Sequence, residues 1–239
     1  MANNFYNAVR RNVSNDSTLP TEVYKAPDTK KAILIELDVA NKSSSGVTVT
    51  VSMCDASQNE TASTTGTVTN ANAHTITGGG PATGTSGLFT TSSSEPHNLI
   101  VNDRVVFTAG TEPSFTNATL PPSGDTELST PTSSPTAARN RMYYVQSVPS
   151  TTTFTIAESE SASSALTFDD TGATTKFSKI HLADIVRDAP VPVGGSLKVI
   201  SGQKLVIESA TANVNDKIYV STSAANAVDC IASVLQEVS

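Results

Sequence analysis

The sequence predicts an all-β protein: an antiparallel β-sandwich, jelly-roll-like, with a small β domain inserted in one of its loops. Short segments in which apolar and polar residues alternate, such as 196–200 and 204–208, recur along the chain and are separated by turn residues such as Ser201-Gly202. Alternation with a period of two buries one set of side chains and leaves the other in water, as an antiparallel sheet requires. The charged fraction is only 15%, while Thr, which suits strands, and Ser, which suits turns, are abundant.

Residues 1–28 form a polar N-terminal arm. Its apolar side chains are too few, and too interrupted by Asn, Ser and Arg, to make a core of their own. We expect the arm to make most of its contacts with another subunit or another protein; an edge strand folded back on the chain's own sandwich is the alternative that stays open. The candidate contact residues are Phe5, Tyr6, Val9, Arg10, Arg11 and Val13.

The sandwich is expected from two separate segments, 29–55 and 175–239. Strand-like alternation covers 32–40 and 47–52 in the first segment, and it resumes from 196 to 235 in the second. Leu34 and Val206 are apolar as well, so the register of these strands is blurred. The residues expected in the core are Ile33, Ile35, Leu37, Val39, Val49, Val51, Leu197, Val199, Leu205, Ile207, Ile218, Val220, Ile231 and Val234.

The amino-acid composition changes between these two segments. Residues 56–87 are rich in Gly, Ser and Thr and predict a flexible linker. Strand patterns return within 88–168, which we expect to form the inserted β domain. Insertion at a loop tip leaves the ladder of the host sheet unbroken.

The sequence contains no arrangement typical of an active site, so we expect no catalytic, metal-binding or cofactor-binding residues. His74, His97 and His181 each lack a second ligand at a suitable spacing. Cys54 and Cys230 are the only cysteines, and we expect both to be small buried side chains. The chain therefore does not read as an enzyme.

Charge and hydropathy exclude two further classes of partner. The net charge is −7, whereas binding to nucleic acid needs clustered Lys and Arg. No stretch approaches the roughly twenty apolar residues of a membrane span, and the N-terminus lacks the pattern of a signal peptide. We therefore expect no membrane partner and synthesis in the cytoplasm.

The predicted insert carries a first resemblance. Its run 96–107 contains His97, Leu99, Val101 and Asp103 at alternate positions, and Tyr143-Tyr144-Val145 and Thr153-Phe154-Thr155-Ile156 follow. This pattern resembles a small β-barrel module of tailed-bacteriophage tail and fibre proteins, itself similar to the first catalytic-cysteine half-domain of ubiquitin-activating enzymes. The Pro- and Ser-rich stretch 109–138 departs from the short connection of that module. No cysteine lies in the insert, so no ubiquitin chemistry carries over.

The outer segments carry a second resemblance. Residues 4–11, 189–199 and 202–208 resemble a family of virion proteins from marine and cyanobacterial tailed phages. The two resemblances imply a non-enzymatic structural protein of the virion, at the neck or tail or decorating the capsid. Its partners would be copies of itself and other virion proteins. The alternative they leave open is a tail-fibre module that binds a glycan or protein of the host surface.

Overall fold

The computed structural model describes residues 4–57, 74–78, 87–91, 96–109, 114–115, 141–170, 176–211 and 214–238. These residues form eighteen strands and no helix, so the all-β prediction is confirmed. The chain divides into two compact units, one made of Met1–Gln58 with His181–Ser239 and the other of Asn59–Ile180. Each unit has its own cluster of buried apolar side chains.

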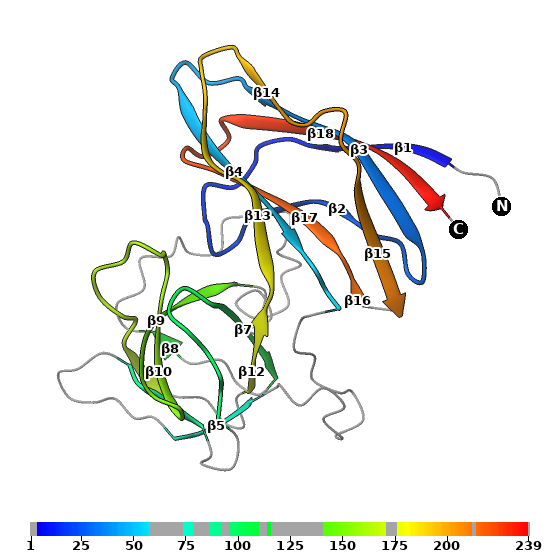
Figure 1. Ribbon diagram of the computed structural model, residues 1–239. Coiled ribbons are helices and arrows are strands. Elements are labelled where there is room, and N and C mark those ends of the chain that lie inside the picture. The colour runs from blue at the N-terminus through cyan, green and yellow to red at the C-terminus, as the bar shows by residue number, and fades with distance from the viewer. Residues whose placement is uncertain are drawn as a thin grey trace. The chain divides into compact units, whose positions relative to one another are not determined.

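The first unit is a sandwich of two antiparallel sheets (Figure 1). In the larger sheet β1 is the edge strand, β18 and β3 follow it, and both β14 and β15 pair with the far side of β3. The smaller sheet has the order β13-β4-β17-β2. The strands of the larger sheet are β1 (Asn4–Arg10), β18 (Val228–Val238), β3 (Lys31–Asn41), β14 (Ser196–Ile200), β15 (Leu205–Thr211) and β16 (Val214–Asn215). Those of the smaller sheet are β13 (Leu182–Val191), β4 (Val47–Cys54), β17 (Lys217–Thr222) and β2 (Thr21–Lys25).

The inward face of each strand supplies the sandwich core, as alternation predicts. Eight of the expected core residues are buried, and Leu197, Val199 and Leu205 are partly buried and pack against them. The eight are Leu37, Val39, Val49, Val51, Ile207, Ile218, Val220 and Val234.

The core assignment is wrong for Ile33, Ile35 and Ile231. A β-bulge in β3 is the reason for the first two: Leu34 and Leu37 are both fully buried although they lie three positions apart. The extra residue shifts the register between Leu34 and Glu36, so the alternation inverts within the strand. In β18 the neighbours of Ile231 point inward, which turns Ile231 outward and leaves it 47% exposed.

The second unit is a closed barrel in which six antiparallel strands follow the order β10-β6-β5-β12-β7-β9. Aromatic side chains fill its core: the rings of Phe89 and Phe154 stack with centroids 5.4 Å apart, and Phe107 packs edge-on against Tyr143 at 5.6 Å. The barrel strands are β5 (His74–Gly78), β6 (Phe89–Thr91), β7 (Arg104–Ala109), β9 (Tyr143–Ser150), β10 (Thr153–Ala157) and β12 (Lys176–Ile180). A separate pair joins β8 (Ser114–Phe115) with β11 (Phe168–Asp170).

The boundaries of the insert are wider than the sequence predicted. The expected linker 56–87 contains β5, which pairs with β6 and β12; residues 58–73 and 79–86 lie outside the described part of the chain. Strand β12 was expected in the sandwich, but it pairs with β7 and β5 of the barrel. The sandwich resumes at β13, whose Leu182 is the register partner of Cys54, the last residue of β4. The chain therefore leaves and re-enters the sandwich at neighbouring positions.

A buried polar hub ties three segments of the sandwich together. Asp216 is 5% exposed, and its carboxylate accepts hydrogen bonds from the backbone N–H groups of Ala56 (2.9 Å) and Glu208 (3.0 Å). Next to it, Asn215 donates through Nδ2 to the carbonyl of Ala26 (2.9 Å). Because the backbone N–H of Ala26 in turn donates to the carbonyl of Asp216, the hub fixes the N-terminal segment to the C-terminal half of the unit.

Candidate interaction surface

The outward face of the larger sheet carries a row of four apolar side chains, one from each of four strands. Phe5 of β1 is the register partner of Leu235 on β18, Leu235 pairs with Ile33 on β3, and Ile33 pairs with Val206 on β15. Register partners lie side by side on the same face of a sheet. Phe5 is 76% exposed and Val206 52%.

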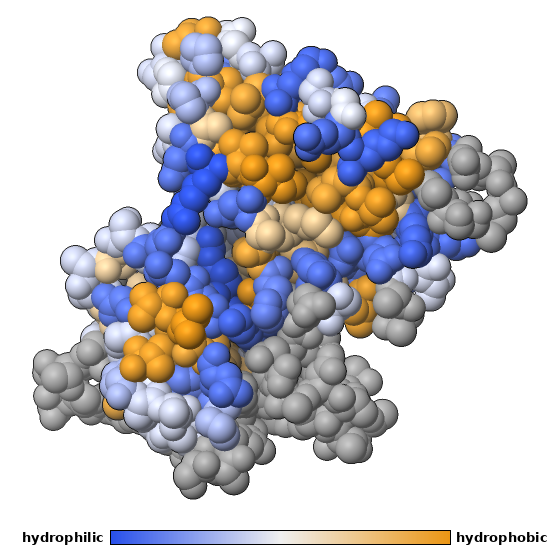
Figure 2. Space-filling view, viewed as in Figure 1, coloured by the Kyte–Doolittle hydropathy of each residue, from blue (hydrophilic) through white to orange (hydrophobic). Residues whose placement is uncertain are grey.

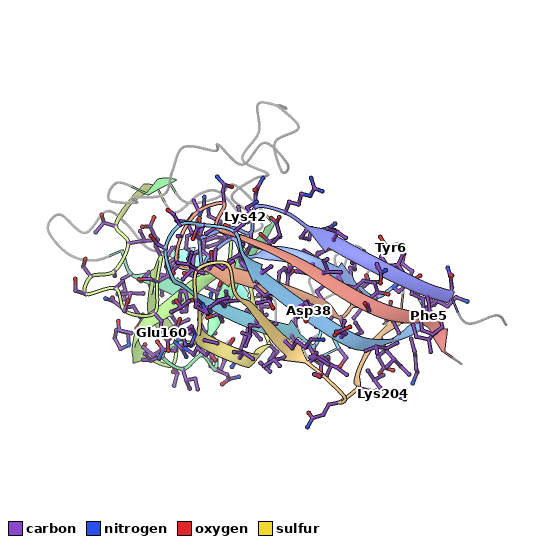
Figure 3. The ribbon with its side chains drawn as sticks, turned by 90° about the horizontal axis from the view of Figure 1, so that it is seen from above. Phe5, Tyr6, Asp38, Lys42, Glu160 and Lys204 are labelled. Carbon is purple, nitrogen blue, oxygen red and sulfur yellow. The ribbon has the colours of Figure 1, made fainter. Side chains whose placement is uncertain are left out.

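A second row crosses the same face four residues further along β1. Val9 pairs with Ile231, Ile231 with Asp38, and Asp38 with Lys198 on β14. Val9 and Ile231 are each 47% exposed. We refer to Phe5, Val9, Ile33, Val206, Ile231 and Leu235 together as the apolar outer face. Figure 3 looks onto this sheet, with Phe5 and Tyr6 labelled toward the β1 side and Asp38 on β3.

Two lysines of this sheet form ion pairs with carboxylates of the same sheet, whereas Asp38 Oδ1 is buried and has no hydrogen-bond partner among the described residues. Lys198 Nζ binds Glu36 Oε1, and this hydrogen bond, with the nearby charge of Asp38, raises the pKa of Lys198. At one margin Lys31 forms an ion pair with Glu208 at 2.9 Å. Each pair is solvent-exposed and contributes little to stability. The pairs leave the apolar outer face surrounded by nearly balanced charge.

A third ion pair lies at the other margin, where Lys42 Nζ is 2.7 Å from Asp229 Oδ1. Burial disfavours the charged form of Asp229, but hydrogen bonds from Lys42 and from the backbone N–H of Asn12 outweigh it. The positive charges of Lys42 and Arg11 add to this effect, so the pKa of Asp229 lies below its ordinary value. The carboxylate is therefore ionised at neutral pH.

The arm folds back as an edge strand on its own sandwich, the alternative that the sequence left open: β1 pairs with β18 over its full length. Tyr6 points inward, where its ring centroid lies 6.3 Å from that of Tyr24 on β2. Tyr6 keeps 46% of its surface exposed, and Phe5 and Val9 are on the outward face. Phe5 and Val9 therefore stay available for a partner, and their contact with another subunit stays a prediction.

The other three candidate residues of the arm differ in how far they contact the rest of the sandwich. Val13 is fully buried in the core and its N–H donates to the carbonyl of Val228 at 3.0 Å, so its assignment to a subunit contact is corrected. Arg10 Nε donates to the carbonyl of Glu22 at 2.7 Å, which ties β1 to the segment of β2. Arg11 is exposed, so it remains available to a partner.

Sequence reasoning placed the candidate contact on the arm alone and missed the residues that β18, β3 and β15 add to it. The sequence does contain an indication of these residues. The runs Ile33-Leu34-Ile35 and Leu205-Val206-Ile207 are apolar at every position, so both faces of each strand carry apolar side chains. A strand that is apolar on both faces buries one face in the core and leaves the other for a partner.

Figure 2 shows a further gathering of apolar residues, on the side of the sandwich where β13, β14 and β15 lie. The partly buried side chains Ile185, Leu197, Val199 and Leu205 come from these strands and pack against the core. This surface is thus the flank of the core, whereas the side chains of the apolar outer face point away from it.

The barrel presents a second, smaller apolar feature on the turn that precedes β7. His97 is the buried residue of this turn: it is 1% exposed and lies edge-on to Phe154, with ring centroids 5.2 Å apart. The N–H of Leu99 donates to His97 Nδ1 at 3.0 Å, and Nε2 lies 3.3 Å from the carbonyl of Thr153. Burial lowers the pKa of His97, against the opposing effect of backbone hydrogen bonds, so the ring is neutral at neutral pH.

Asp103 closes the same turn. Its Oδ2 accepts a hydrogen bond from the N–H of Ile100 at 2.9 Å and lies 2.7 Å from Lys179 Nζ on β12. Its backbone carbonyl accepts from the N–H of Val145 at 2.8 Å. Within the run 96–107, β7 thus begins only at Arg104, and the preceding residues form a braced turn.

The tip of this turn exposes two neighbouring β-branched side chains. Ile100 is 67% exposed and Val101 52%. Asn98 and Asn102 on either side adopt left-handed backbone conformations, with φ of 50° and 73°, which Asn tolerates better than most residues. The turn thus holds Ile100 and Val101 in fixed positions in the solvent.

Within the described residues no three His, Cys, Asp or Glu side chains cluster in a way that could hold a metal ion. None of the described elements is a helix that could cross a membrane. Comparison of the chain with protein-family models, with curated proteins and with solved structures finds no match.

Proposed function

We propose that the chain is a non-enzymatic structural protein of a tailed-phage virion, present in several copies as a building block or adaptor at the neck, tail or capsid surface. The apolar outer face is the observation that carries this proposal. Scattered apolar residues on a surface are ordinary, but a contiguous group drawn from four strands is typical of a protein contact. The resemblance of residues 4–11, 189–199 and 202–208 to phage virion proteins supplies the kind of assembly.

The physical form of the surface suits a building block. A β-sheet face is rigid because every strand in it is hydrogen-bonded to its neighbours, so little conformational entropy is lost on binding. The braced edge strand adds to this rigidity, since Arg10 and Val13 tie the arm to the rest of the sandwich. A rigid apolar surface suits the repeated contacts of a particle. Other virion proteins and copies of the chain are the partners that the proposal names.

The proposal is tested on particles. An antibody raised against the recombinant chain is applied to tailed particles purified by density gradient from the culture that carries the gene, and quantitative mass spectrometry counts the chain against the other proteins of the particle. We expect immunogold label at one position of every particle and more than one copy per particle. Absence of the chain from intact particles would contradict the proposal.

A second candidate function is favoured by the barrel turn. A preorganised pair of exposed apolar side chains, Ile100 and Val101, is suited to recognition of a host-surface protein or glycan. On this view the barrel is the recognition module of a fibre. Binding of the purified chain to host cells, weakened by Val101→Asp and unaffected by Phe5→Asp, would favour this candidate over the first.

A further inference from the structure

We infer that the partner of the apolar outer face is a second copy of the same chain, packed face to face about a two-fold axis. This inference deepens the proposed function and rests on it for its purpose, because it names the contact through which copies associate. Two features of the sheet carry it, the charge around the face and the order of the side chains across it; the size of the face limits the strength of the contact.

The charge around the face suits a copy of this chain better than a charged partner. The chain carries a net charge of −7, so two copies repel each other over most of their surfaces. On this sheet, however, Lys198 is bound to Glu36, and Lys31 to Glu208. Apart from Asp38, a second copy therefore meets balanced charge here, and a polyanion such as nucleic acid finds no excess positive charge to bind.

The order of side chains across the strands is self-complementary. A two-fold axis that runs along the strands, midway between β18 and β3, exchanges the two ends of each row. Phe5 of one copy then lies over Val206 of the other, and Leu235 lies over Ile33, so the first row packs on itself. This is the aligned packing that pairs of β-sheets adopt, at about −30°.

In the second row the same axis gives an apolar contact at each end and a polar contact in the middle, where Ile231 of one copy lies over Asp38 of the other. Val9 of one copy lies over Lys198 of the other, whose methylene groups can cover an apolar side chain while the ammonium group stays with Glu36. The polar residues Asn7 and Ser233 lie between the rows, where the hydroxyl and amide groups can bridge the two sheets.

The size of the face sets the strength of the contact. Four strands about 4.8 Å apart and the seven residues of β1 at about 3.4 Å each give a footprint of roughly 400–500 Å². A standard interface covers about 800 Å² per partner, so the isolated dimer should be weak, with a dissociation constant of about 0.1–1 mM. Contacts of this strength become effective when many copies are held together.

Disulfide trapping tests the arrangement in the purified full-length chain. The double variant Phe5→Cys, Val206→Cys places one new thiol at each end of the first row, and the native Cys54 and Cys230 are buried and do not compete. Under mild oxidation we expect a dimer linked at both sites, at least tenfold more abundant than in the control. The matched control is the double variant Phe5→Cys, Val101→Cys, since Val101 has the same exposure as Val206, 52%.

A second measurement does not depend on cysteine chemistry. Sedimentation equilibrium at concentrations up to about 1 mM should show a monomer–dimer equilibrium that Ile231→Asp weakens at least tenfold, while circular dichroism stays that of the folded chain. Equal trapping in the test and control variants, or a strictly monomeric chain at 1 mM, overturns the inference. Because both measurements use the purified chain, their failure leaves the location of the protein in particles to be decided separately.

Discussion

Removal of the Asp216 carboxylate should destabilise the sandwich more than removal of any exposed carboxylate. The change Asp216→Ala leaves two backbone N–H groups, the buried one of Ala56 and the partly buried one of Glu208, without the acceptor they have in the native chain. A hydrogen bond to a charged group contributes about 1.5–3 kcal/mol, so two such bonds give about 3–6 kcal/mol. Release of the carboxylate from burial recovers part of this, and we expect a loss of about 3–4 kcal/mol.

The cysteines offer an assay that reports on the sandwich alone. Cys54 and Cys230 are both buried in that unit and the barrel has none, so pulsed thiol labelling along a urea gradient follows only the unfolding of the sandwich. Asp229→Ala is the control: its carboxylate also binds a backbone N–H and a lysine, but near the surface, and its loss should cost about 1 kcal/mol or less. If Asp216→Ala and Asp229→Ala shift the transition equally, the hub does not hold the unit together.

Three further predictions concern the thiols, the barrel turn and the insertion. Burial raises the pKa of Cys230 to about 12, and Cys54 is buried as well. At pH 8 an aromatic disulfide reagent should therefore react with no thiol of the native chain and with two thiols after denaturation, whereas a fast-reacting thiol in the native chain would contradict the burial of these residues. Burial also lowers the pKa of His97 from its ordinary value of 6.5, so at a pH between the folded and the unfolded pKa the unfolded barrel binds a proton that the folded barrel does not. The urea concentration at the midpoint of barrel unfolding should therefore be lower at pH 5.5 than at pH 7.5 in the wild type, and the same at both pH values in His97→Asn. Replacement of residues 59–180 by a short turn should leave a soluble sandwich with one cooperative transition, because Leu182 and Cys54 are adjacent; loss of that transition would mean that the sandwich needs the barrel.

Alternation was enough to predict the fold class and most of the sandwich strands, because each strand buries one face in a core. It failed where the register breaks. The bulge at Ile35 lets Leu34 and Leu37 share the buried face, and no single-strand pattern fixes the position of a bulge. Strand β5 was missed because a Thr- and Gly-rich segment has the composition of a linker. Residues 176–180, which form β12 of the barrel, were assigned to the sandwich segment, since alternation says nothing about the pairing partner.

The candidate surface was only half predictable for a related reason. The two aromatic residues of the arm indicated a contact, but the register between β1, β18, β3 and β15 cannot be deduced from the pattern of any single strand. Without that register Ile33 was assigned to the core, and Leu235 was not connected with the arm. Only their pairing across the sheet places them beside Phe5 in one row.

The most direct test of the central claim is the number of copies of the chain per particle when the apolar outer face is altered. Particles are produced in cells that supply the wild-type chain, Phe5→Asp or, as a matched control on the barrel, Val101→Asp, and the copies are counted by quantitative mass spectrometry. We expect the wild type and Val101→Asp at the same number of copies, more than one per particle, and Phe5→Asp reduced at least tenfold. Incorporation of Phe5→Asp at the wild-type number would contradict the claim that this face builds the assembly.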